Sequence, residues 1–522
     1  MQKVLIDGEW TVSDSTSSFN ASNPSTGQSL DEAYPVSSWN DCDRALQAAT
    51  TAFQQMRELS SDQLAVFIET YADRIEARAD EICETANQET GLPVNPRLLD
   101  IELPRTTNQL RLAAKAVRDA SWAQPTIDTG TGIRSVYGAI GPVAVFGPNN
   151  FPFAFGSISG GDFAAALAAG NPVIAKANSS HPATTRLFAE EAIAAAQATN
   201  MPQGIVQLLY RTSHADGERL VADPRLAAVG YTGSRSAGLK LKQAADQHGK
   251  PIYLELSSIN PVVVLPGAIE ERGAEIATEL AGSCLMGTGQ FCTSPGLIVC
   301  IGEQETKEFV NAFVEGVKSA ACGTLLSQSV QSTLDTSVKA IVQSGASLLC
   351  GGTIADGPAV RFSNTVLQAT GEQFLKAPEA FQTEAFGNAS LVVVATDVEQ
   401  VCDIMSELEG NLTGCIYSHT GETDDATYQK VVPGLRQKVG RLLNDKMPTG
   451  VAVSAAMNHG GPFPATGHPG FSAVGIPQSI HRFAMLQCFD NVRDHRLPPI
   501  LQAANPSKFM RKVDGSWTEK SV

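Results

Sequence analysis

Between Ser135 and Leu256 the chain repeats one pattern, a short apolar run followed by an Ala-rich helical stretch. The runs are VAVFG (143–147), PVIAK (172–176), IVQLLY (205–210), AAVGYTG (227–233) and IYLEL (252–256). Strands that are apolar throughout and alternate with helices are typical of βαβ units in a parallel sheet. We therefore predict an α/β fold of the nucleotide-binding kind, with ligands at the carboxyl ends of the strands.

The rest of the chain divides into three further regions. From about Asp41 to Arg118, apolar residues recur every three or four positions with Ser or Asp at capping positions, which predicts amphipathic helices. A second α/β region is expected from about Asn260 to Pro448, with apolar strands at NPVVVL, GLIVCI, ASLLCGG and SLVVVA. From about Gln478 the sequence is hydrophobic but irregular, and we expect it to return to an earlier domain or a neighbouring subunit.

The net charge of the chain limits the kinds of partner that it can bind. The 522 residues include 54 acidic and 38 basic side chains, a net charge of −16 with neutral His. A chain this acidic repels phosphate backbones and anionic lipids, so we expect neither nucleic acid nor a membrane as partner. The start, MQKVLIDGEW, lacks the apolar run of a secretory signal, and Gly and Pro interrupt the apolar stretches. We therefore expect a soluble, cytoplasmic protein.

Cysteine spacing argues against disulfides and structural metal. The ten cysteines are scattered without a C-x-x-C pair, so we predict no disulfide framework and no metal site. Cys292 differs from the others because it follows a Gly-rich turn, GTGQFC, where backbone N–H groups can lower the pKa of a thiol. Taken alone, a buried structural thiol remains the commoner interpretation.

A carboxylate ends the last of the five apolar runs. Glu255 would lie at the edge where an α/β sheet binds its ligands, and a carboxylate in an apolar strand is costly unless it is used or paired. From the residues alone, a surface strand end is an equal alternative. The segment from Gly233 to Gly238 lacks the Lys-Ser/Thr of a phosphate loop, and no G-x-G-x-x-G follows a strand. A dinucleotide would bind here without the ordinary fingerprint.

Six motifs together resemble the aldehyde dehydrogenase superfamily over nearly the whole chain. They are Gly147-Pro-Asn-Asn-Phe-Pro152, Lys176-Ala-Asn-Ser179, Gly230-Tyr-Thr-Gly-Ser234, Leu254-Glu-Leu256, Gly289-Gln-Phe-Cys292 and Glu384-Ala-Phe-Gly387. The resemblance implies the aldehyde dehydrogenase fold, which has a Rossmann-like dinucleotide domain, an α/β catalytic domain and an oligomerisation hairpin. We assign residues 1–256 to the N-terminal helices and dinucleotide domain, 121–141 to the hairpin, 257–477 to the catalytic domain and 478–522 to a returning C-terminal segment.

The resemblance implies NAD(P)-dependent oxidation of a small aldehyde to a carboxylic acid. The Cys292 thiolate would attack the carbonyl, and the oxyanion would be held by the side-chain amide of Asn150 and the backbone N–H of Cys292. Hydride loss would leave a thioester, and Glu255, with a pKa raised by partial burial, would activate the hydrolytic water. Relatives that pass the acyl group to coenzyme A typically lack this Glu, so its presence favours hydrolysis.

Motif position also implies the residues that bind the dinucleotide. Lys176 would hold the adenosine ribose. Gly233 and Ser234 would lie at the pyrophosphate, in a strand-to-helix turn whose free N–H groups attract phosphate. Glu384 would hold the nicotinamide ribose, with Phe386 packing beside it.

One departure from the family pattern concerns cofactor choice. NAD-preferring members commonly carry a Glu three residues after the lysine, where this chain has Ser179. The change removes repulsion toward a 2′-phosphate, and Arg211, at the end of the run 205–210, would add a charge-assisted pair. We therefore predict that NADP is preferred over NAD. For Arg211, a solvated arginine at a strand end is an equal alternative.

Two segments point toward a substrate. PRTTNQLR (104–111) and MNHGGPFPAT (457–466) resemble the branch that contains 2-oxoglutarate semialdehyde (2,5-dioxopentanoate) dehydrogenases and an NADP-dependent fatty aldehyde dehydrogenase. Arg105 would pair with the distal carboxylate of an acidic semialdehyde, with a structural ion pair as the equal alternative. Phe151, Phe153 and Phe155 belong either to the aldehyde tunnel or to the core. His459 is expected near the mouth of the site, with a contact role only.

We predict oxidation of 2,5-dioxopentanoate to 2-oxoglutarate by a homodimer or tetramer, the dimer being the simplest expectation for this branch. The rival enzyme activity is NADP-dependent oxidation of long-chain aliphatic aldehydes, which an apolar tunnel with Arg105 turned away would favour. A non-catalytic binding relative is the rival from another class. The presence of Cys292, Glu255 and Asn150 argues against that rival.

Overall fold

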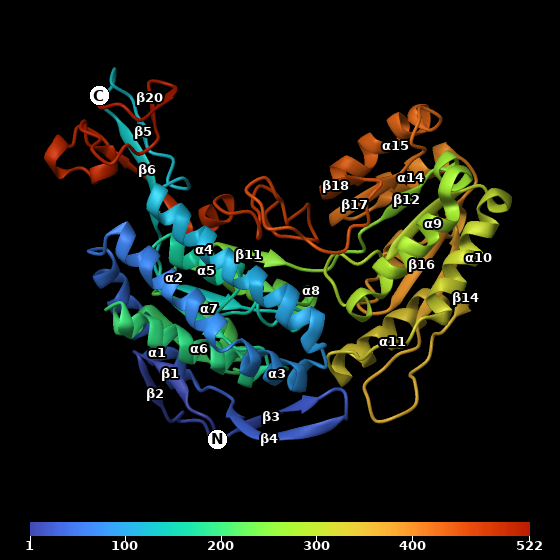
Figure 1. Cartoon of the computed structure of the whole chain (residues 1–522), viewed down its shortest axis with the longest axis horizontal. Coiled ribbons are helices and arrows are strands. Elements are labelled where there is room, and N and C mark those ends of the chain that lie inside the picture. Colours follow the sequence, from blue (N-terminus) through green and yellow to red (C-terminus); the bar gives the residue numbers. More distant parts are fainter.

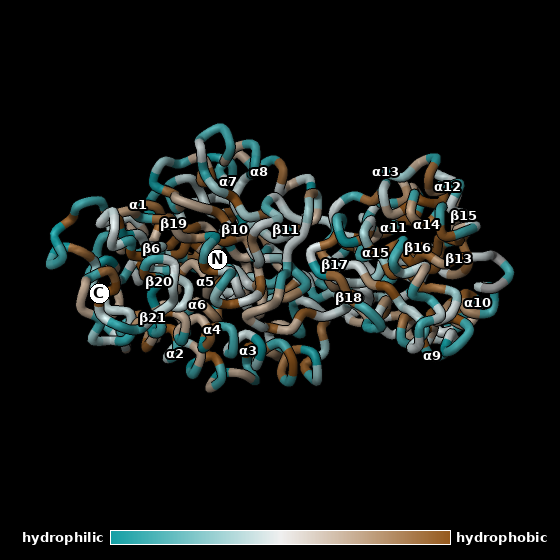
Figure 2. Tube along the Cα trace, turned by 90° about the horizontal axis from the view of Figure 1, so that it is seen from above, coloured by the Kyte–Doolittle hydropathy of each residue, from teal (hydrophilic) through white to brown (hydrophobic). Residues whose placement is uncertain are grey.

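Three sheets organise the chain in this computed structural model, which describes residues 1–522 apart from the side chains of Glu303 and Glu305. Two seven-stranded sheets form two lobes side by side, and a five-stranded sheet projects from the first lobe as an arm (Figure 1). Seen from above, the lobes are joined by a narrower waist, and hydrophobic segments run through the interior of each (Figure 2). The α/β class expected from the sequence is confirmed.

The five apolar runs form adjacent parallel strands in the first sheet, as predicted. The strand order is β11-β10-β7-β8-β9-β1-β2. The parallel strands are β7 (Val143–Phe146), β8 (Val173–Lys176), β9 (Val206–Leu209), β10 (Ala228–Thr232) and β11 (Ile252–Glu255), and β1 (Val4–Ile6) and β2 (Glu9–Thr11) extend the sheet antiparallel. Lys176 is in register with Leu209, and Glu255 with Thr232. The carboxyl ends of the strands therefore share one edge.

Helices cover this sheet, and their ends carry the expected capping residues. Ser38 and Ser60 each form a reciprocal capping box, with Asp41 and Gln63 three residues later. Gly91 ends a helix in the left-handed conformation that favours glycine. The helices are α1 (Trp39–Met56), α2 (Ser61–Ala77), α3 (Ala79–Thr90), the π-helical η1 (Val94–Glu102), α4 (Leu103–Asp119), α5 (Gly161–Ala168), α6 (Pro182–Ala198), η2 (Gln203–Ile205), α7 (His214–Ala222) and α8 (Arg235–Gln247).

The second sheet forms the other lobe, in the order β14-β15-β16-β13-β12-β17-β18. Its strands are β12 (Val262–Val264), β13 (Leu297–Ile301), β14 (Ser347–Cys350), β15 (Thr365–Thr370), β16 (Ala389–Ala395), β17 (Asn411–Tyr417) and β18 (Val439–Asn444), parallel except for β14 at one edge. Its helices are α9 (Pro266–Leu285), η3 (Met286–Gly289), α10 (Glu303–Ser319), α11 (Gln328–Gln343), α12 (Gly371–Lys376), α13 (Pro378–Phe381), α14 (Val398–Glu407) and α15 (Asp425–Lys438). Strands β15, β17 and β18 were not predicted because polar residues interrupt their apolar runs.

The arm combines a hairpin from the first lobe with the end of the chain. Its strands, in spatial order, are β19 (Ala484–Phe489), β6 (Arg134–Ala139), β5 (Thr126–Ile127), β20 (Arg511–Val513) and β21 (Ser516–Thr518). Short 3-10 turns precede and join them: η4 (Gln478–Phe483), η5 (Asp494–Arg496) and η6 (Pro499–Leu501). The fully buried Arg511 donates to backbone carbonyls that include those of Ala503 and Lys520, which fixes the C-terminal segment. A separate hairpin, β3 (Ser18–Asn23) and β4 (Gln28–Pro35), lies near the N-terminus.

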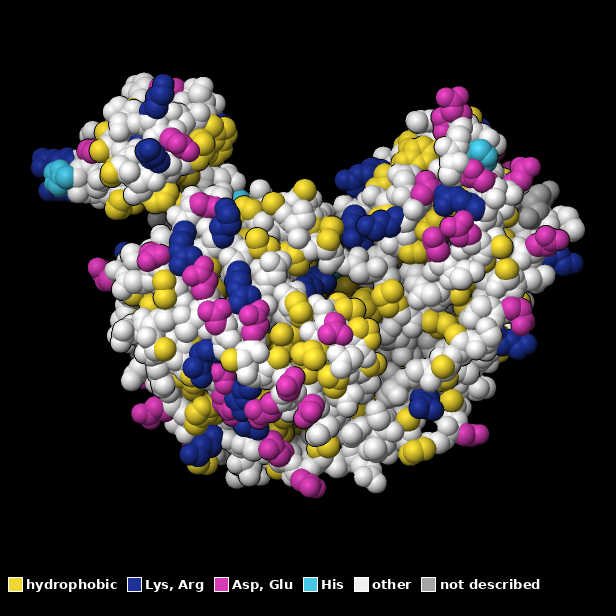
Figure 3. Space-filling model, in the orientation of Figure 1, with side chains coloured by type: hydrophobic (Ala, Val, Ile, Leu, Met, Phe, Trp, Pro, Cys, Tyr) yellow, Lys and Arg dark blue, Asp and Glu magenta, His cyan; other side chains and the backbone are white. Residues whose placement is uncertain are grey.

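The two lobes meet along a hollow in which hydrophobic and Lys or Arg side chains gather (Figure 3). The irregular segment 445–477 returns across it, and the Leu256 N–H donates to the Ala465 carbonyl at 2.8 Å. An ion pair between Arg235 and Glu409, 2.8 Å long, also joins the lobes. The carboxyl edge of the first sheet thus faces the second lobe. Within the described residues, no helix is long and apolar enough to cross a membrane.

Candidate active site

Cys292 lies in a tight loop that follows η3. A Cβ added at Gly289 would lie 2.1 Å from the Gly387 carbonyl oxygen, and the φ of Gly289 is +68°, so glycine alone fits there. Asn260 Nδ2 donates hydrogen bonds to the backbone carbonyls of Cys292 and Ser294, at 2.9 Å each. The loop is therefore held on both sides of the sulfur-bearing residue.

The Asn260 side chain is itself fixed by a buried network. Its backbone has a φ of +46°, a left-handed conformation that Asn tolerates better than most residues. Asn411 Oδ1 accepts the N–H groups of Ile259 and Asn260 at 2.8 and 3.1 Å. Thr413 and Ser258 donate their hydroxyls to Asn260 Oδ1 at 2.9 and 2.8 Å. These buried polar groups satisfy one another, which keeps the network rigid.

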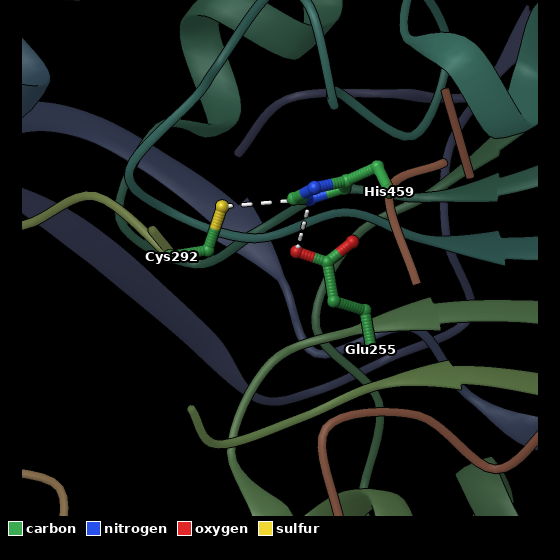
Figure 4. Close-up of side chains that lie close together, drawn as sticks. All are labelled: Glu255, Cys292 and His459. Carbon is green, nitrogen blue, oxygen red and sulfur yellow. Dashed lines mark hydrogen bonds and ion pairs between the residues drawn. The ribbon is translucent and has the colours of Figure 1, made fainter. Parts of the chain in front are cut away.

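Three side chains from distant parts of the chain converge at the sulfur (Figure 4). Glu255 ends β11, Cys292 follows η3, and His459 comes from the returning segment 445–477. His459 Nε2 lies 2.8 Å from Glu255 Oε1 and 3.5 Å from Cys292 Sγ. Glu255 is 5% exposed and His459 2% exposed. Glu255 Oε2 has no hydrogen-bond partner among the described residues.

Burial and charge shift the pKa values of this cluster in different directions. Burial, followed by the charge and hydrogen bond of Glu255, raises the pKa of the Cys292 thiol well above its usual value. Burial also acts to raise the pKa of Glu255, but the charge and hydrogen bond of His459, with smaller contributions that include Cys292, hold it below the usual value. The predicted raised pKa of Glu255 is therefore wrong, because the sequence did not place His459 beside it. A protonated thiol faces an ionised carboxylate that can accept its proton.

The loop after β7 carries Asn150 and is clamped by a buried carboxylate. Glu102 Oε1 accepts the backbone N–H groups of Phe153 and Ala154 at 2.9 and 3.0 Å. The other oxygen of Glu102 pairs with Arg97, which also donates to the Asn150 carbonyl at 3.1 Å. This clamp fixes the backbone on both sides of Phe151.

The side-chain amide of Asn150 reaches residues 289–294, which carry Cys292, the predicted nucleophile, and are called the nucleophile loop. Its Nδ2 donates to the Gln290 carbonyl at 2.9 Å, two residues before Cys292. An amide nitrogen carries two hydrogens, so one donor remains for another acceptor. The predicted oxyanion donor is thus placed beside the loop that bears the thiol.

Arg105, in the first turn of α4, directs its guanidinium over two aromatic rings. Its Cζ lies 5.3 Å from the ring centre of Phe155 and 5.8 Å from that of Phe151. Its Nε and Nη2 atoms are buried and have no hydrogen-bond partner among the described residues. Burial lowers the pKa of Arg105, while the nearby carboxylates of Glu102 and Glu255 act to raise it. The alternative of a structural ion pair is not seen at these two nitrogens.

The three alternating phenylalanines do not share one environment. Phe151 packs against Phe291, with ring centres 5.0 Å apart, and Phe155 against His459 at 5.5 Å. Phe153 is fully buried and packs on Phe188 at 5.2 Å. Phe151 and Phe155 line the site, whereas Phe153 belongs to the core.

The residues predicted at the adenosine end lie together at the edge of the first sheet. Lys176 ends β8, Arg211 follows the neighbouring β9, and Ser179 lies in the turn between β8 and α6. Burial lowers the pKa of Lys176 to about 8, and the charge of Arg211 acts in the same direction. The Arg211 side chain is exposed. Two cationic residues and a serine thus lie at or just after the ends of neighbouring strands at this edge.

The turn predicted for the pyrophosphate opens α8. Ser234 is the N-cap of this helix, with its hydroxyl accepting the Ala237 N–H at 3.4 Å. The Gly233 N–H donates to the Glu255 carbonyl at 3.1 Å, which ties the turn to β11. The first turn of a helix offers free N–H groups and a positive dipole end, so this position fits a phosphate.

Glu384 and Phe386 line a pocket that also includes Gly289 and Phe291 from the nucleophile loop. Burial raises the pKa of Glu384 to about 7, while hydrogen bonds from Ser257 and Ser258 act to lower it. The pocket therefore joins the predicted nicotinamide-ribose residues to the loop of Cys292.

Several groups that position the site were not predicted from the sequence. The motifs indicate only a contact role at the mouth for His459, yet the imidazole is buried between the thiol and the carboxylate. No motif identified Arg97, Glu102 or Asn260. For Glu102, a charged residue among the apolar positions of a predicted helix was the available signal. His459 and Asn260 gave no comparable signal, because their importance depends on contacts across the fold.

Comparisons with known proteins agree with this geometry. The profile described as "Aldehyde dehydrogenase family" matches residues 10–461. The chain is 37% identical over 523 residues to α-ketoglutaric semialdehyde dehydrogenase 2 of Azospirillum brasilense, covering 98% of each chain. It is 35% identical over 495 residues to an α-ketoglutaric semialdehyde dehydrogenase of Acinetobacter baylyi, covering 92% of each.

Among solved structures, lactaldehyde dehydrogenase of Escherichia coli superposes with a TM-score of 0.81, covering 94% of this chain and 98% of that one, at 22% identity. The sheets described above are thus those of the dinucleotide, catalytic and oligomerisation parts of a known fold. The chain belongs to the aldehyde dehydrogenase family. It is an oxidoreductase of the NAD(P)-dependent class.

Proposed function

We propose that this dehydrogenase oxidises 2-oxoglutarate semialdehyde (2,5-dioxopentanoate) to 2-oxoglutarate. The observation that carries the proposal is the buried, unpaired edge of the Arg105 guanidinium beside Phe151 and Phe155. The names of the two bacterial relatives support it, because α-ketoglutaric semialdehyde is the same compound.

Two buried guanidinium nitrogens without a partner are costly, and an anionic substrate would remove that cost. The two unpartnered atoms of Arg105, Nε and Nη2, form one edge of the planar group. That edge matches a carboxylate in a bidentate arrangement. A long-chain aliphatic aldehyde would leave the edge unsatisfied, so the site favours an acidic semialdehyde over this alternative.

In the mechanism that we infer, Glu255 takes the thiol proton and Cys292 attacks the aldehyde carbon. The free hydrogen of the Asn150 amide and the Cys292 backbone N–H stabilise the oxyanion. When bound, the nicotinamide supplies the hydride acceptor for the oxidation step. Cys292 then carries a thioester, and Glu255 releases the thiol proton to solvent. Glu255 next accepts a proton from the water that hydrolyses the thioester, and that proton returns to the Cys292 sulfur as the carboxylic acid leaves. His459 donates to Glu255 and keeps the carboxylate oriented.

Glu255→Gln should slow hydrolysis of the thioester more than the steps before it. We expect the steady-state rate to fall by about 10²–10⁴-fold, the usual contribution of a general base. A burst of reduced cofactor should persist, because His459 still lies 3.5 Å from the sulfur and can accept the thiol proton. Stopped-flow absorbance separates the two phases. The control is Glu372→Gln, which changes an exposed glutamate in the same way. An equal loss of rate in the burst and in the steady state of Glu255→Gln would contradict the role of Glu255 as the base for hydrolysis.

Arg105→Ala should reduce selectivity for acidic substrates. A charge-assisted hydrogen bond contributes about 1.5–3 kcal/mol, so kcat/KM for 2,5-dioxopentanoate should fall at least about tenfold relative to that for decanal. The matched control is Arg111→Ala, which removes an exposed arginine of the same helix that pairs with Asp73 and Glu76. If Arg105→Ala lowers kcat/KM for 2,5-dioxopentanoate and for decanal by the same factor, Arg105 does not recognise a carboxylate. Wild-type preference for decanal would favour the aliphatic alternative.

We propose further that NADP is the preferred cofactor. Lys176 and Arg211 offer positive charge at the adenosine end, and Ser179 offers a hydroxyl where a carboxylate would repel a phosphate. The 2′-phosphate would in turn stabilise these neighbouring cations, which repel each other in its absence.

The preference should depend on pH and on Ser179. With a pKa of about 8, the Lys176 ammonium is charged below that pH and loses its charge above it. The ratio of kcat/KM for NADP to that for NAD should therefore fall as pH rises through about 8, and Lys176→Arg should abolish the fall. Ser179→Glu should reverse the preference, by about tenfold or more. An unchanged ratio in Ser179→Glu would show that this residue does not face the 2′-phosphate.

We also propose that the chain forms a homodimer through the arm. Strand β19 lies at one edge of the arm sheet and β18 at one edge of the catalytic sheet, so both have open backbone groups. Met485 and Leu486 on β19 are 47% and 55% exposed. An exposed apolar edge strand of this kind fits a subunit interface.

Leu486→Asp should weaken that interface by placing a charge on it. Light scattering coupled to size exclusion should give twice the 55.1 kDa chain mass for the wild type and a shift toward the monomer for the variant. Ile354→Asp, at another exposed apolar position, is the control. A monomeric wild type, or a Leu486→Asp variant of unchanged mass, would contradict the proposed interface.

A further inference from the structure

We propose that Cys292, His459 and Glu255 also form a site for a zinc ion, and that the bound ion holds the enzyme in a reversible inactive state. Each residue offers one ligand atom, and the three atoms lie within 4.8 Å of one another. They come from three separate segments, so cysteine spacing in the sequence gave no sign of the site.

The distances suit a tetrahedral ion. Zn–S and Zn–N bonds of about 2.3 and 2.0–2.1 Å place the two ligand atoms about 3.6 Å apart at a tetrahedral angle. Cys292 Sγ and His459 Nε2 are already 3.5 Å apart. The hydrogen bond between His459 and Glu255, at 2.8 Å, has to open by about half an ångström for both atoms to face one ion. The Glu255 oxygen lies within 4.8 Å of the sulfur and has to settle at about 3.6 Å from it.

The donor set selects the class of metal. A thiolate, an imidazole and a carboxylate together are typical zinc ligands, whereas Mg²⁺ and Ca²⁺ prefer oxygen ligands alone. Glu255 can also coordinate an ion through its second oxygen, because Oε2 has no hydrogen-bond partner among the described residues. With three protein ligands, the fourth position is left for water.

Charge balance also favours a dication. Binding replaces the S–H bond of Cys292 by an S–Zn bond and releases the proton to solvent, with no change of oxidation state. One thiolate and one carboxylate then neutralise Zn²⁺ in a buried place where a net charge is costly. His459 binds as the neutral imidazole, with Nε2 facing the ion.

Metal binding would block the reaction at its first step. The sulfur lone pair used to attack the aldehyde becomes engaged with the ion, and Glu255 is no longer free to accept a proton. This inhibitory effect rests on the proposed role of Cys292 as nucleophile. Binding of the metal itself does not depend on the substrate or on that role.

The test uses the full-length protein, without substrate or cofactor, titrated with Co²⁺ as a spectroscopic probe and then with Zn²⁺. We expect one Co²⁺ per chain, with a thiolate-to-cobalt charge-transfer band and the intense visible bands of tetrahedral coordination. Zn²⁺ should displace Co²⁺ and abolish these bands. Zn²⁺ should also inhibit aldehyde oxidation, EDTA should restore it, and Mg²⁺ at the same concentration should have no effect.

Variants assign the ligands. Cys292→Ser should lose the charge-transfer band, and His459→Gln should weaken Zn²⁺ binding at least about tenfold. The control is Cys488→Ser, which removes an exposed thiol and should keep both the stoichiometry and the band. Thermal unfolding and NADP binding verify that each variant is folded.

A second measurement needs no variant. Zn²⁺ should protect Cys292 of the wild type from iodoacetamide, as read by peptide mass spectrometry, while the partly exposed Cys402 on α14 stays reactive. The proposal is overturned if the band persists in Cys292→Ser, if it disappears in Cys488→Ser, or if Zn²⁺ leaves the alkylation of Cys292 unchanged. An enzyme that binds zinc in this way but does not oxidise 2,5-dioxopentanoate would contradict only the proposed substrate.

Discussion

The hydrogen bonds that Asn260 donates to the carbonyls of Cys292 and Ser294 are the constraint on which the site depends. They connect the nucleophile loop to the start of the second lobe, and Asn411 fixes the backbone that presents them. Because the side chains of Ser258, Asn260, Asn411 and Thr413 are buried, loss of one partner would leave others unsatisfied. The position of the sulfur is thus set by the core of the catalytic lobe and not by the flexibility of a surface loop.

Cationic side chains lie at both ends of the proposed site, although the overall charge is −16. Arg105 lies on the proposed substrate side, and Lys176 and Arg211 lie at the proposed adenosine end of the sheet edge. The separation between Arg105 and the Lys176–Arg211 pair suits the proposed ligands. NADP, a long anion, and a short anionic semialdehyde would approach the aldehyde carbon from two directions. The acidic surface elsewhere disfavours binding of such anions outside these positions.

Much of this architecture can be predicted from the sequence. Uninterrupted apolar runs specify the five parallel strands of the first sheet, and the strand ends place Lys176, Ser234 and Glu255 at one edge. Strands such as β15 and β17 escape prediction because they mix Thr, Gln and Asn with apolar residues and rely on pairing with neighbours for their conformation.

Site chemistry that depends on contacts across the fold is harder to predict. The depressed pKa of Glu255 requires His459, which is 204 residues away in sequence. The clamp of Glu102 on the loop of Asn150 likewise joins segments that no local pattern links. Sequence motifs locate the reacting groups, whereas the groups that tune and hold them emerge only when the chain is folded.

The convergence of three distant segments on one sulfur determines when the site forms as the chain folds. The thiol gains its base only after β11 is paired, and the imidazole arrives only when the segment 445–477 has crossed between the lobes. A nascent or partly unfolded chain therefore carries ten ordinary thiols and no catalytic assembly. The arrangement of thiol, carboxylate and imidazole is therefore absent until segment 445–477 has folded against both lobes, so the onset of activity reports that step of folding.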